Sequence, residues 1–257
     1  MEKILSRYSP VVLAALYLTL SSTPLQAAEI NLAVANSTCS AIKKVGEMFE
    51  QRNDLAINYL CKSSGRLAKG LNGNTISADI YISANRRWMD YMINNGLVQA
   101  QKVSSPWGNE LVVATPKSSS MTLNDWSELA SDKVTTILIG DPGTAPFGRY
   151  AKQALQSTGL WDKVKHKIAT KKHITLLAET LAESDPGTVG ILFASNINEA
   201  HRKILSVDKA WHPPIRYFMA PLGNADQNDK VKDLLDFILD NDAKAMFRQA
   251  GFQVETD

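Results

Sequence analysis

Two kinds of apolar pattern alternate along the chain. Continuous apolar runs with the length of buried strands occupy residues 30–35, 55–60 and 79–83. Between and after these runs, apolar residues recur every three or four positions, which predicts helices beginning at Ser37 and at Ser63 and a third helix over 86–95. This alternation of strand and helix predicts a parallel sheet covered by helices.

A second alternating series follows in the other half of the chain. Its expected strands are residues 111–115, 134–139 and 189–193. Its expected helices are residues 148–157 and 174–183, and two more helices are expected at the C-terminus, over 230–240 and 243–249. Two such series predict an α/β protein with two lobes.

The lobes are expected to be joined by two chain crossings. We interpret the apolar segments 111–115 and 216–222 as two connectors that form a two-strand hinge. The first lobe then comprises residues 29–110 and 217–257, and the second comprises 111–216. In such an architecture a ligand binds in the cleft between the lobes, at the carboxyl ends of the strands, which is typical of a binding protein.

The N-terminus has the composition of a secretory signal peptide, predicted over residues 1–28. Lys3 and Arg7 make its start positive, an apolar stretch follows at 11–20, and small and polar residues lead to cleavage after Ala27 or Ala28. The apolar stretch is too short for a stable membrane anchor. We therefore expect an exported mature chain located in the periplasm.

The charge of the mature chain argues against nucleic acid as a partner. Of 28 Lys and Arg and 26 Asp and Glu, the signal peptide removes Lys3, Arg7 and Glu2, so the mature net charge is 26 minus 25, or +1. Binding to nucleic acid needs a basic face, which such a balance does not favour.

Three expected strand-to-helix junctions are rich in small, polar and turn residues. The stretch IGDPGTAPFGRYAKQAL, at 139–155, places Gly and Pro turns between a strand and a helix. The other two junctions carry Ser37 and Ser64, each of which is taken singly as an ordinary helix cap. If the two strands are neighbours and parallel, both helix N-termini meet at one sheet edge, where hydroxyls and free N–H groups suit a small oxyanion.

The two cysteines of the mature chain are Cys39 and Cys61. In an oxidising compartment an even number suggests a disulfide, although a pair of buried free thiols is the alternative. Because no histidine lies at ligand spacing from either cysteine, a zinc site is not expected.

Several motifs together resemble those of a known family. They are INLAVANSTCSAI, CKSSGRLAKGL, ADIYISANRRWMDYMINNGLV, GNELVVATPK, GDPGTAPFGRYAKQALQSTGLW and GILFAS. They resemble the periplasmic molybdate-binding proteins of ABC importers, over about residues 30–252. The resemblance implies a periplasmic-binding-protein-like fold that holds molybdate or tungstate as the transported ligand and no other cofactor. It also implies a membrane permease as partner, and we expect a monomer.

The resemblance also implies which residues contact the oxyanion. Matched by motif, the two family serines fall on Ser37 and Ser64, and two backbone N–H contacts fall on Phe147 and Ile174. The family tyrosine falls on Phe193, which has no hydroxyl to donate. Phe147 also replaces a residue that is commonly small in the family.

These departures leave the ligand open between molybdate or tungstate and another oxyanion, such as sulfate or chromate. Arg66, next to the second serine, is interpreted either as a solvated surface residue or as a cation that compensates for the lost hydroxyl. The resemblance further places Cys39 in the first turn after the first strand and Cys61 at the end of the second, within reach of a disulfide if those strands are neighbours.

An exported hydrolase using Ser37 or Ser64 as nucleophile is the alternative from another class. A serine nucleophile needs a base within reach. The four histidines, at positions 166, 173, 201 and 212, lie outside the site motifs, and G-x-S-x-G, H-E-x-x-H and P-loop patterns do not occur in the sequence. Only His173 adjoins a matched contact, where it is interpreted as a solvated helix start, with an approach to the cleft as the alternative. We therefore expect no enzymatic activity.

Overall fold

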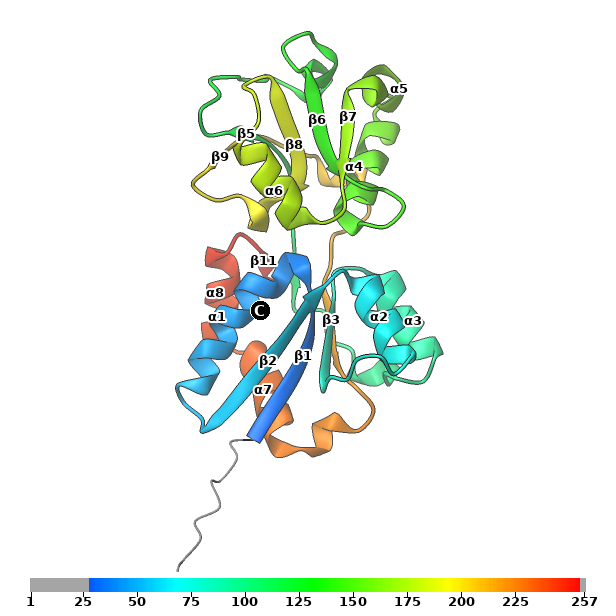
Figure 1. Cartoon of the computed structure of the whole chain (residues 1–257), viewed down its shortest axis with the longest axis vertical. Coiled ribbons are helices and arrows are strands. Elements are labelled where there is room, and N and C mark those ends of the chain that lie inside the picture. The colour runs from blue at the N-terminus through cyan, green and yellow to red at the C-terminus, as the bar shows by residue number, and fades with distance from the viewer. Residues whose placement is uncertain (1–27, 255–257) are drawn as a thin grey trace, which may run out of the picture.

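The computed structural model describes residues 28–254, which fold into two α/β lobes joined at a narrow waist (Figure 1). The predicted signal peptide lies outside the described residues, apart from Ala28, the first residue of strand β1. Cleavage after Ala27 would leave the whole of β1 in the mature chain.

The first lobe contains a four-stranded sheet in the order β10-β3-β1-β2. Its strands are β1 (Ala28–Ala35), β2 (Leu55–Lys62), β3 (Ile80–Ser83) and β10 (Phe218–Pro221). Strands β1, β2 and β3 are parallel, as predicted, and β10 pairs antiparallel with β3. The helices that follow the parallel strands are α1 (Cys39–Glu50), α2 (Ser64–Asn72) and α3 (Arg86–Asn94).

The second lobe contains a five-stranded sheet in the order β7-β6-β8-β5-β9. Its strands are β5 (Leu111–Pro116), β6 (Thr136–Gly140), β7 (Ile168–Lys171), β8 (Thr188–Phe193) and β9 (His201–Ser206). Its helices are α4 (Pro146–Ser157), α5 (Trp161–Val164) and α6 (Ile174–Ala182). Strand β6 is parallel to β7 and β8, whereas β5 is antiparallel to β8 and β9.

The C-terminal segment returns to the first lobe, where α7 (Asp229–Ile238) and α8 (Asn241–Gln249) lie beside α1 (Figure 1). The last described strand, β11 (Gln253–Val254), pairs with β4 (Trp107–Gly108) next to the crossing between the lobes.

The segment 111–115 is a strand, as predicted, but it and most of 216–222 lie within the sheets of the lobes rather than in the crossings between them. Residues 111–115 belong to β5, an internal strand of the second sheet, and most of 216–222 forms β10, the edge strand of the first sheet. The two crossings lie immediately before these strands, and Gly108 and Arg216 form a bridge between them. All six residues of β5 are buried. A strand buried on both faces is a continuous apolar run, which sequence alone does not distinguish from an apolar connector.

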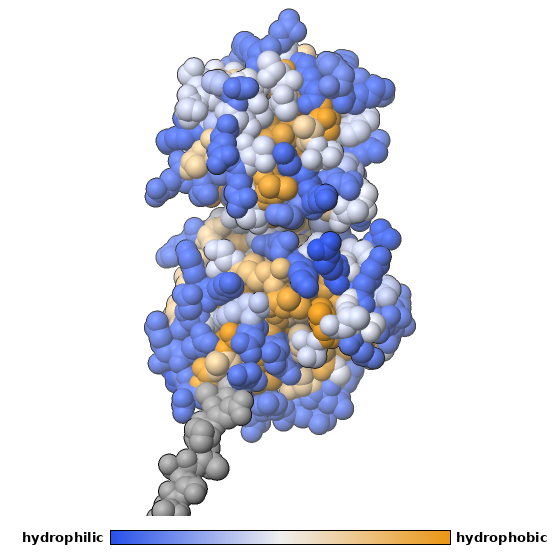
Figure 2. Space-filling view, in the orientation of Figure 1, coloured by the Kyte–Doolittle hydropathy of each residue, from blue (hydrophilic) through white to orange (hydrophobic). Residues whose placement is uncertain are grey.

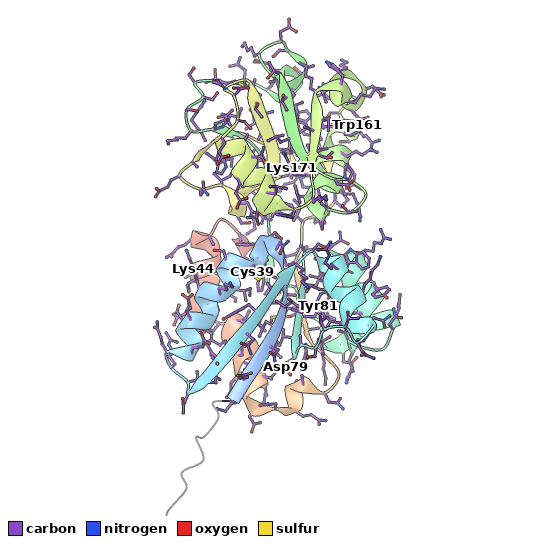
Figure 3. The ribbon with its side chains drawn as sticks, in the orientation of Figure 1. Cys39, Lys44, Asp79, Tyr81, Trp161 and Lys171 are labelled. Atoms are coloured by element: carbon purple, nitrogen blue, oxygen red, sulfur yellow. A yellow bond between two sulfur atoms is a disulfide. The ribbon has the colours of Figure 1, made fainter. Side chains whose placement is uncertain are left out.

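The sheet of the first lobe has a core on each face, as the alternation of side chains along β1 requires. Ile30, Leu32 and Val34 belong to one buried cluster, whereas the intervening Ala33 belongs to the other. That second cluster also contains Tyr81 of β3, which Figure 3 shows inside the first lobe near α2.

The surface of the described chain is mainly hydrophilic on the face drawn in Figure 2, which is constricted between the two lobes. Among the helices of residues 28–254, none has both the length and the apolar character that crossing a membrane requires.

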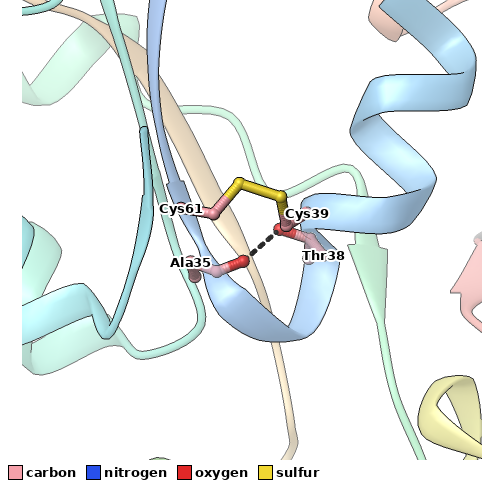
Figure 4. The surroundings of a disulfide bond; sticks show 4 residues. All are labelled: Ala35, Thr38, Cys39 and Cys61. Atoms are coloured by element: carbon pink, nitrogen blue, oxygen red, sulfur yellow. Dashed lines mark hydrogen bonds between the residues drawn. A yellow bond between two sulfur atoms is a disulfide. The ribbon is translucent and has the colours of Figure 1, made fainter. Parts of the chain in front are cut away.

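A disulfide joins Cys39, the first residue of α1, to Cys61 in β2, and confirms the predicted pairing (Figure 4). Their Cα atoms are 6.0 Å apart. The turn between β1 and α1 is also closed by the Thr38 hydroxyl, which donates to the Ala35 carbonyl at 3.1 Å. The segment that carries Ser37 is therefore fixed to the strand that leads to Ser64.

Candidate functional site

All five residues predicted to contact a ligand line one small cavity between the lobes. Ser37 and Ser64 come from the first lobe, whereas Phe147, Ile174 and Phe193 come from the second. The rest of the lining consists of Ala35, Asn36, Ser63, Ala84, Ala145, Pro146, Lys172 and His173. About 30 Å³ is open to the centre of a water-sized sphere. Ligand pockets for larger organic molecules occupy roughly 300–1,000 Å³, so this cavity suits a small ion.

Three helices begin at this cavity, α2 from the first lobe and α4 and α6 from the second. The first N–H groups of a helix have no acceptor within it, and the helix dipole adds partial positive charge there. Ser64 and Ile174 are the first residues of α2 and α6, and Phe147 follows the Pro that begins α4. Their positions favour an anion as ligand.

The turn residues between β6 and α4 keep the start of α4 close to the end of its strand. The Asp141 carboxylate accepts hydrogen bonds from the Gly143 N–H at 2.9 Å and the Thr144 hydroxyl at 2.8 Å. These two bonds hold the pKa of Asp141 below its ordinary value. Beyond the turn, Gly148 packs directly on Gly140, and a Cβ at Gly148 would overlap the carbonyl of Gly140. Side chains larger than hydrogen would move α4 away from the cavity.

The hydroxyl of Ser64 is buried and already has a donor. Ser64 is 2% exposed, and its Oγ accepts a hydrogen bond from the Ala84 N–H at 3.0 Å. A serine hydroxyl has one proton and two lone pairs. With an N–H group on one lone pair, its own proton is left to donate to a ligand oxygen in the cavity.

The hydroxyl of Ser37, a half-buried residue, also has a donor already in place. Its Oγ accepts a hydrogen bond from the Tyr217 phenol at 3.1 Å. Complete burial raises the pKa of Tyr217 well above its ordinary value, so the phenol keeps its proton. Sequence reasoning did not identify Tyr217 because it lies 180 positions from its partner, without a motif around it.

Aromatic rings form the wall of the cavity where the resemblance would place a tyrosine hydroxyl. Phe193 is 1% exposed, and its ring lies 6.1 Å from that of Phe147, 6.2 Å from Tyr150 and 6.4 Å from Tyr217 between centroids. The lining thus combines donors on several sides with an apolar wall. Arg66 has an exposed side chain and lies outside this lining, in agreement with the interpretation as a solvated surface residue.

The polar groups described at the two serines do not form a nucleophile and base. The partners of both hydroxyls are a protonated phenol, that of Tyr217, and a peptide N–H, that of Ala84, and neither is a base that could take the serine proton. His173 is exposed and caps α6, with its Nδ1 accepting the Leu176 N–H at 3.1 Å. Within residues 28–254, His, Cys, Asp and Glu form no group of three or more able to hold a metal ion.

One family model and several individual proteins match most of this chain. The family described as bacterial extracellular solute-binding protein matches residues 30–253. The molybdate-binding protein ModA of Escherichia coli is 26% identical over 235 residues, which cover 88% of this chain and 90% of that protein.

Two solved structures share the fold at lower identity. The periplasmic molybdate-binding protein of Azotobacter vinelandii has a TM-score of 0.77 at 17% identity, covering 88% of this chain and 100% of that one. The sulfate-binding protein SubI of Mycobacterium tuberculosis has a TM-score of 0.70 at 13% identity, covering 88% and 87%. At such identities the likeness shows the fold and leaves the ligand open.

Proposed function

Because the chain belongs to the bacterial extracellular solute-binding proteins, which serve ABC transporters and are not enzymes, we propose that its solute is a tetrahedral oxyanion, molybdate or tungstate. The observation that carries the proposal is the cavity itself. Donors from both lobes surround a space for one small ion, and each serine hydroxyl already accepts one hydrogen bond and keeps its proton to donate.

In the proposed binding mode, neutral hydroxyl and backbone N–H groups bind the anion, with little contribution from charged side chains. Ser37 and Ser64 donate through their hydroxyls, and Phe147 and Ile174 donate through backbone N–H groups at helix starts. Hydrogen bonds to a charged group contribute about 1.5–3 kcal/mol each. Helix N-termini add favourable partial charge for an anion. Lys172 is the one fully charged side chain of the described lining, and it is exposed.

The location and partners of the protein follow from the same proposal. The signal peptide at 1–28 exports the chain to the periplasm, where it works as a monomer. The lobes close around the anion, and the closed form delivers it to the membrane permease of an ABC importer. For this movement we propose a first lobe of residues 29–110 and 217–257 and a second lobe of residues 111–216.

A different oxyanion, sulfate or chromate, is the second candidate. The observation that favours it is the ring of Phe193, which offers no hydroxyl and packs beside Phe147 against the cavity. Fewer donors and an aromatic wall alter the size and the hydrogen bonding that the cavity offers. Sulfate is smaller than molybdate, because sulfur–oxygen bonds are shorter than molybdenum–oxygen bonds.

Calorimetric titration tests the proposal. Protein purified by unfolding, removal of bound anions and refolding is titrated with molybdate, tungstate, chromate, sulfate and phosphate. We expect one molybdate or tungstate per chain, bound more tightly than the other anions. Tighter binding of sulfate or chromate would select the second candidate, and absence of binding by all five anions would refute an oxyanion-binding function.

A further inference from the structure

A chain of hydrogen bonds, through two buried residues, runs from the crossing between the lobes to the hydroxyl of Ser37. The side-chain Nδ2 of Asn109 donates to the phenol oxygen of Tyr217 at 3.2 Å, and that phenol donates to Ser37 Oγ at 3.1 Å. Asn109 is 4% exposed and Tyr217 is fully buried.

The direction of each proton in this chain is determined by its first member. The Oδ1 of Asn109 accepts from the Glu110 N–H at 2.9 Å and from the Ser195 N–H at 3.4 Å, so the other end of the amide is the donor. The amide occupies a lone pair of the phenol oxygen, and the phenol proton then points to Ser37. Ser37 in turn has its own proton left for the cavity that it lines.

The two intermediate residues come from the two chain crossings. Asn109 lies between β4 and β5, and Tyr217 immediately precedes β10. Asn109 also donates to the Ser195 hydroxyl at 2.7 Å, just beyond the end of β8 that carries Phe193. The network therefore contacts the hinge and both lobes at once.

We propose that Asn109 and Tyr217 are positioning residues for the anion, which hold the Ser37 hydroxyl as a donor aimed into the cavity. This inference rests on the proposed oxyanion-binding function. Aligned hydrogen bonds in a low-dielectric interior polarise one another, so the terminal donor is strengthened toward a negative oxygen.

A double-mutant cycle tests the inference. Tyr217→Phe removes the hydroxyl and keeps the ring, and we expect molybdate affinity to fall by about 3- to 10-fold, the range for one uncharged hydrogen bond. In the Ser37→Ala background the same substitution should change affinity by less than about twofold, because its partner is absent. In the Ser64→Ala background it should cost the full factor.

Two further variants complete the test: one is a control for loss of a buried phenol, and the other probes the same network at Asn109. Tyr81→Phe removes an equally buried phenol, which donates to the Ser64 carbonyl at 2.9 Å rather than to a hydroxyl. It should show no coupling to Ser37→Ala. Asn109→Leu keeps a side chain of similar size, adds no charge and removes the donor to the phenol. Its cost should also shrink in the Ser37→Ala background, which keeps the test available if Tyr217→Phe folds poorly.

The outcomes separate this inference from the proposed function. If the wild-type protein binds none of the tetrahedral oxyanions, the proposed function itself fails. If it binds molybdate but Tyr217→Phe leaves affinity unchanged, or costs the same with and without the Ser37 hydroxyl, the positioning role is refuted and the proposed function stands.

Discussion

Replacing Ser64 by Ala removes a hydroxyl that has one role in the structure and a second in the proposed complex. In the free protein, Ser64 Oγ accepts the Ala84 N–H at 3.0 Å inside the first lobe. In the proposed complex the same hydroxyl donates its proton to the anion. The substitution should therefore lower both stability and affinity, each for its own reason.

The magnitudes follow from the burial of the site. Ser64 is 2% exposed, so the Ala84 N–H loses its partner where water does not easily replace it. A buried donor left without an acceptor costs about 1–3 kcal/mol, which lowers the melting temperature by about 2–12 °C for a chain of this size. Loss of a hydrogen bond to a charged ligand costs about 1.5–3 kcal/mol, or roughly 10- to 150-fold in affinity.

The assay is calorimetric titration with molybdate, accompanied by thermal unfolding without ligand. Ser119→Ala is a matched control, because Ser119 is also buried and its Oγ accepts a backbone N–H, that of Met121, at 3.2 Å. It lies outside the lining of the cavity, beyond the end of β5. We expect the control to lose stability and keep its affinity. A Ser64→Ala protein that binds molybdate as tightly as Ser119→Ala would refute the reasoning.

Three other substitutions test separate parts of the structure. Phe193→Tyr should strengthen molybdate binding by up to about 1.5–3 kcal/mol in the same titration, since the ring lines the cavity and gains a donor; a loss would indicate that the hydroxyl is buried among the rings. Replacing Cys39 and Cys61 together by Ala should lower the free energy of unfolding, measured by urea denaturation, by about 3 kcal/mol, because the disulfide closes a loop with a sequence separation of 22. An unchanged midpoint would contradict a stabilising role. Gly148→Ala should destabilise the protein by about 1–3 kcal/mol and weaken anion binding, because the added methyl overlaps Gly140; wild-type melting and affinity would show that α4 accommodates it.

The sequence predicts the repeating elements of the fold well because their signals are local. The periodicity around α1 and the Pro and Gly turns before α4 depend on residues near one another in the chain. Short strands such as β7 and β9 were not predicted. The residues of β7 are all at least partly exposed, and those of β9 largely so, hence neither has the apolar run that signals a buried strand.

In the candidate site, too, residues with a local sequence signal were predicted and residues without one were not. Ser37 and Ser64 were predicted because each follows a strand and lies at the start of a helical segment, which is a local pattern. Asn109 and Tyr217 were not found, because they meet through pairing between the two crossings, 108 positions apart. Local sequence contains no signal for a contact that arises only when the two crossings lie side by side.

The most direct test of the account is a crystal structure of the protein with tungstate, located by the anomalous scattering of tungsten. The account predicts a single strong anomalous peak in the cavity between the lobes, with oxygens in hydrogen-bond contact with the hydroxyls of Ser37 and Ser64 and the N–H groups of Phe147 and Ile174. A peak only at other positions, or an empty cavity at a saturating tungstate concentration, would contradict it.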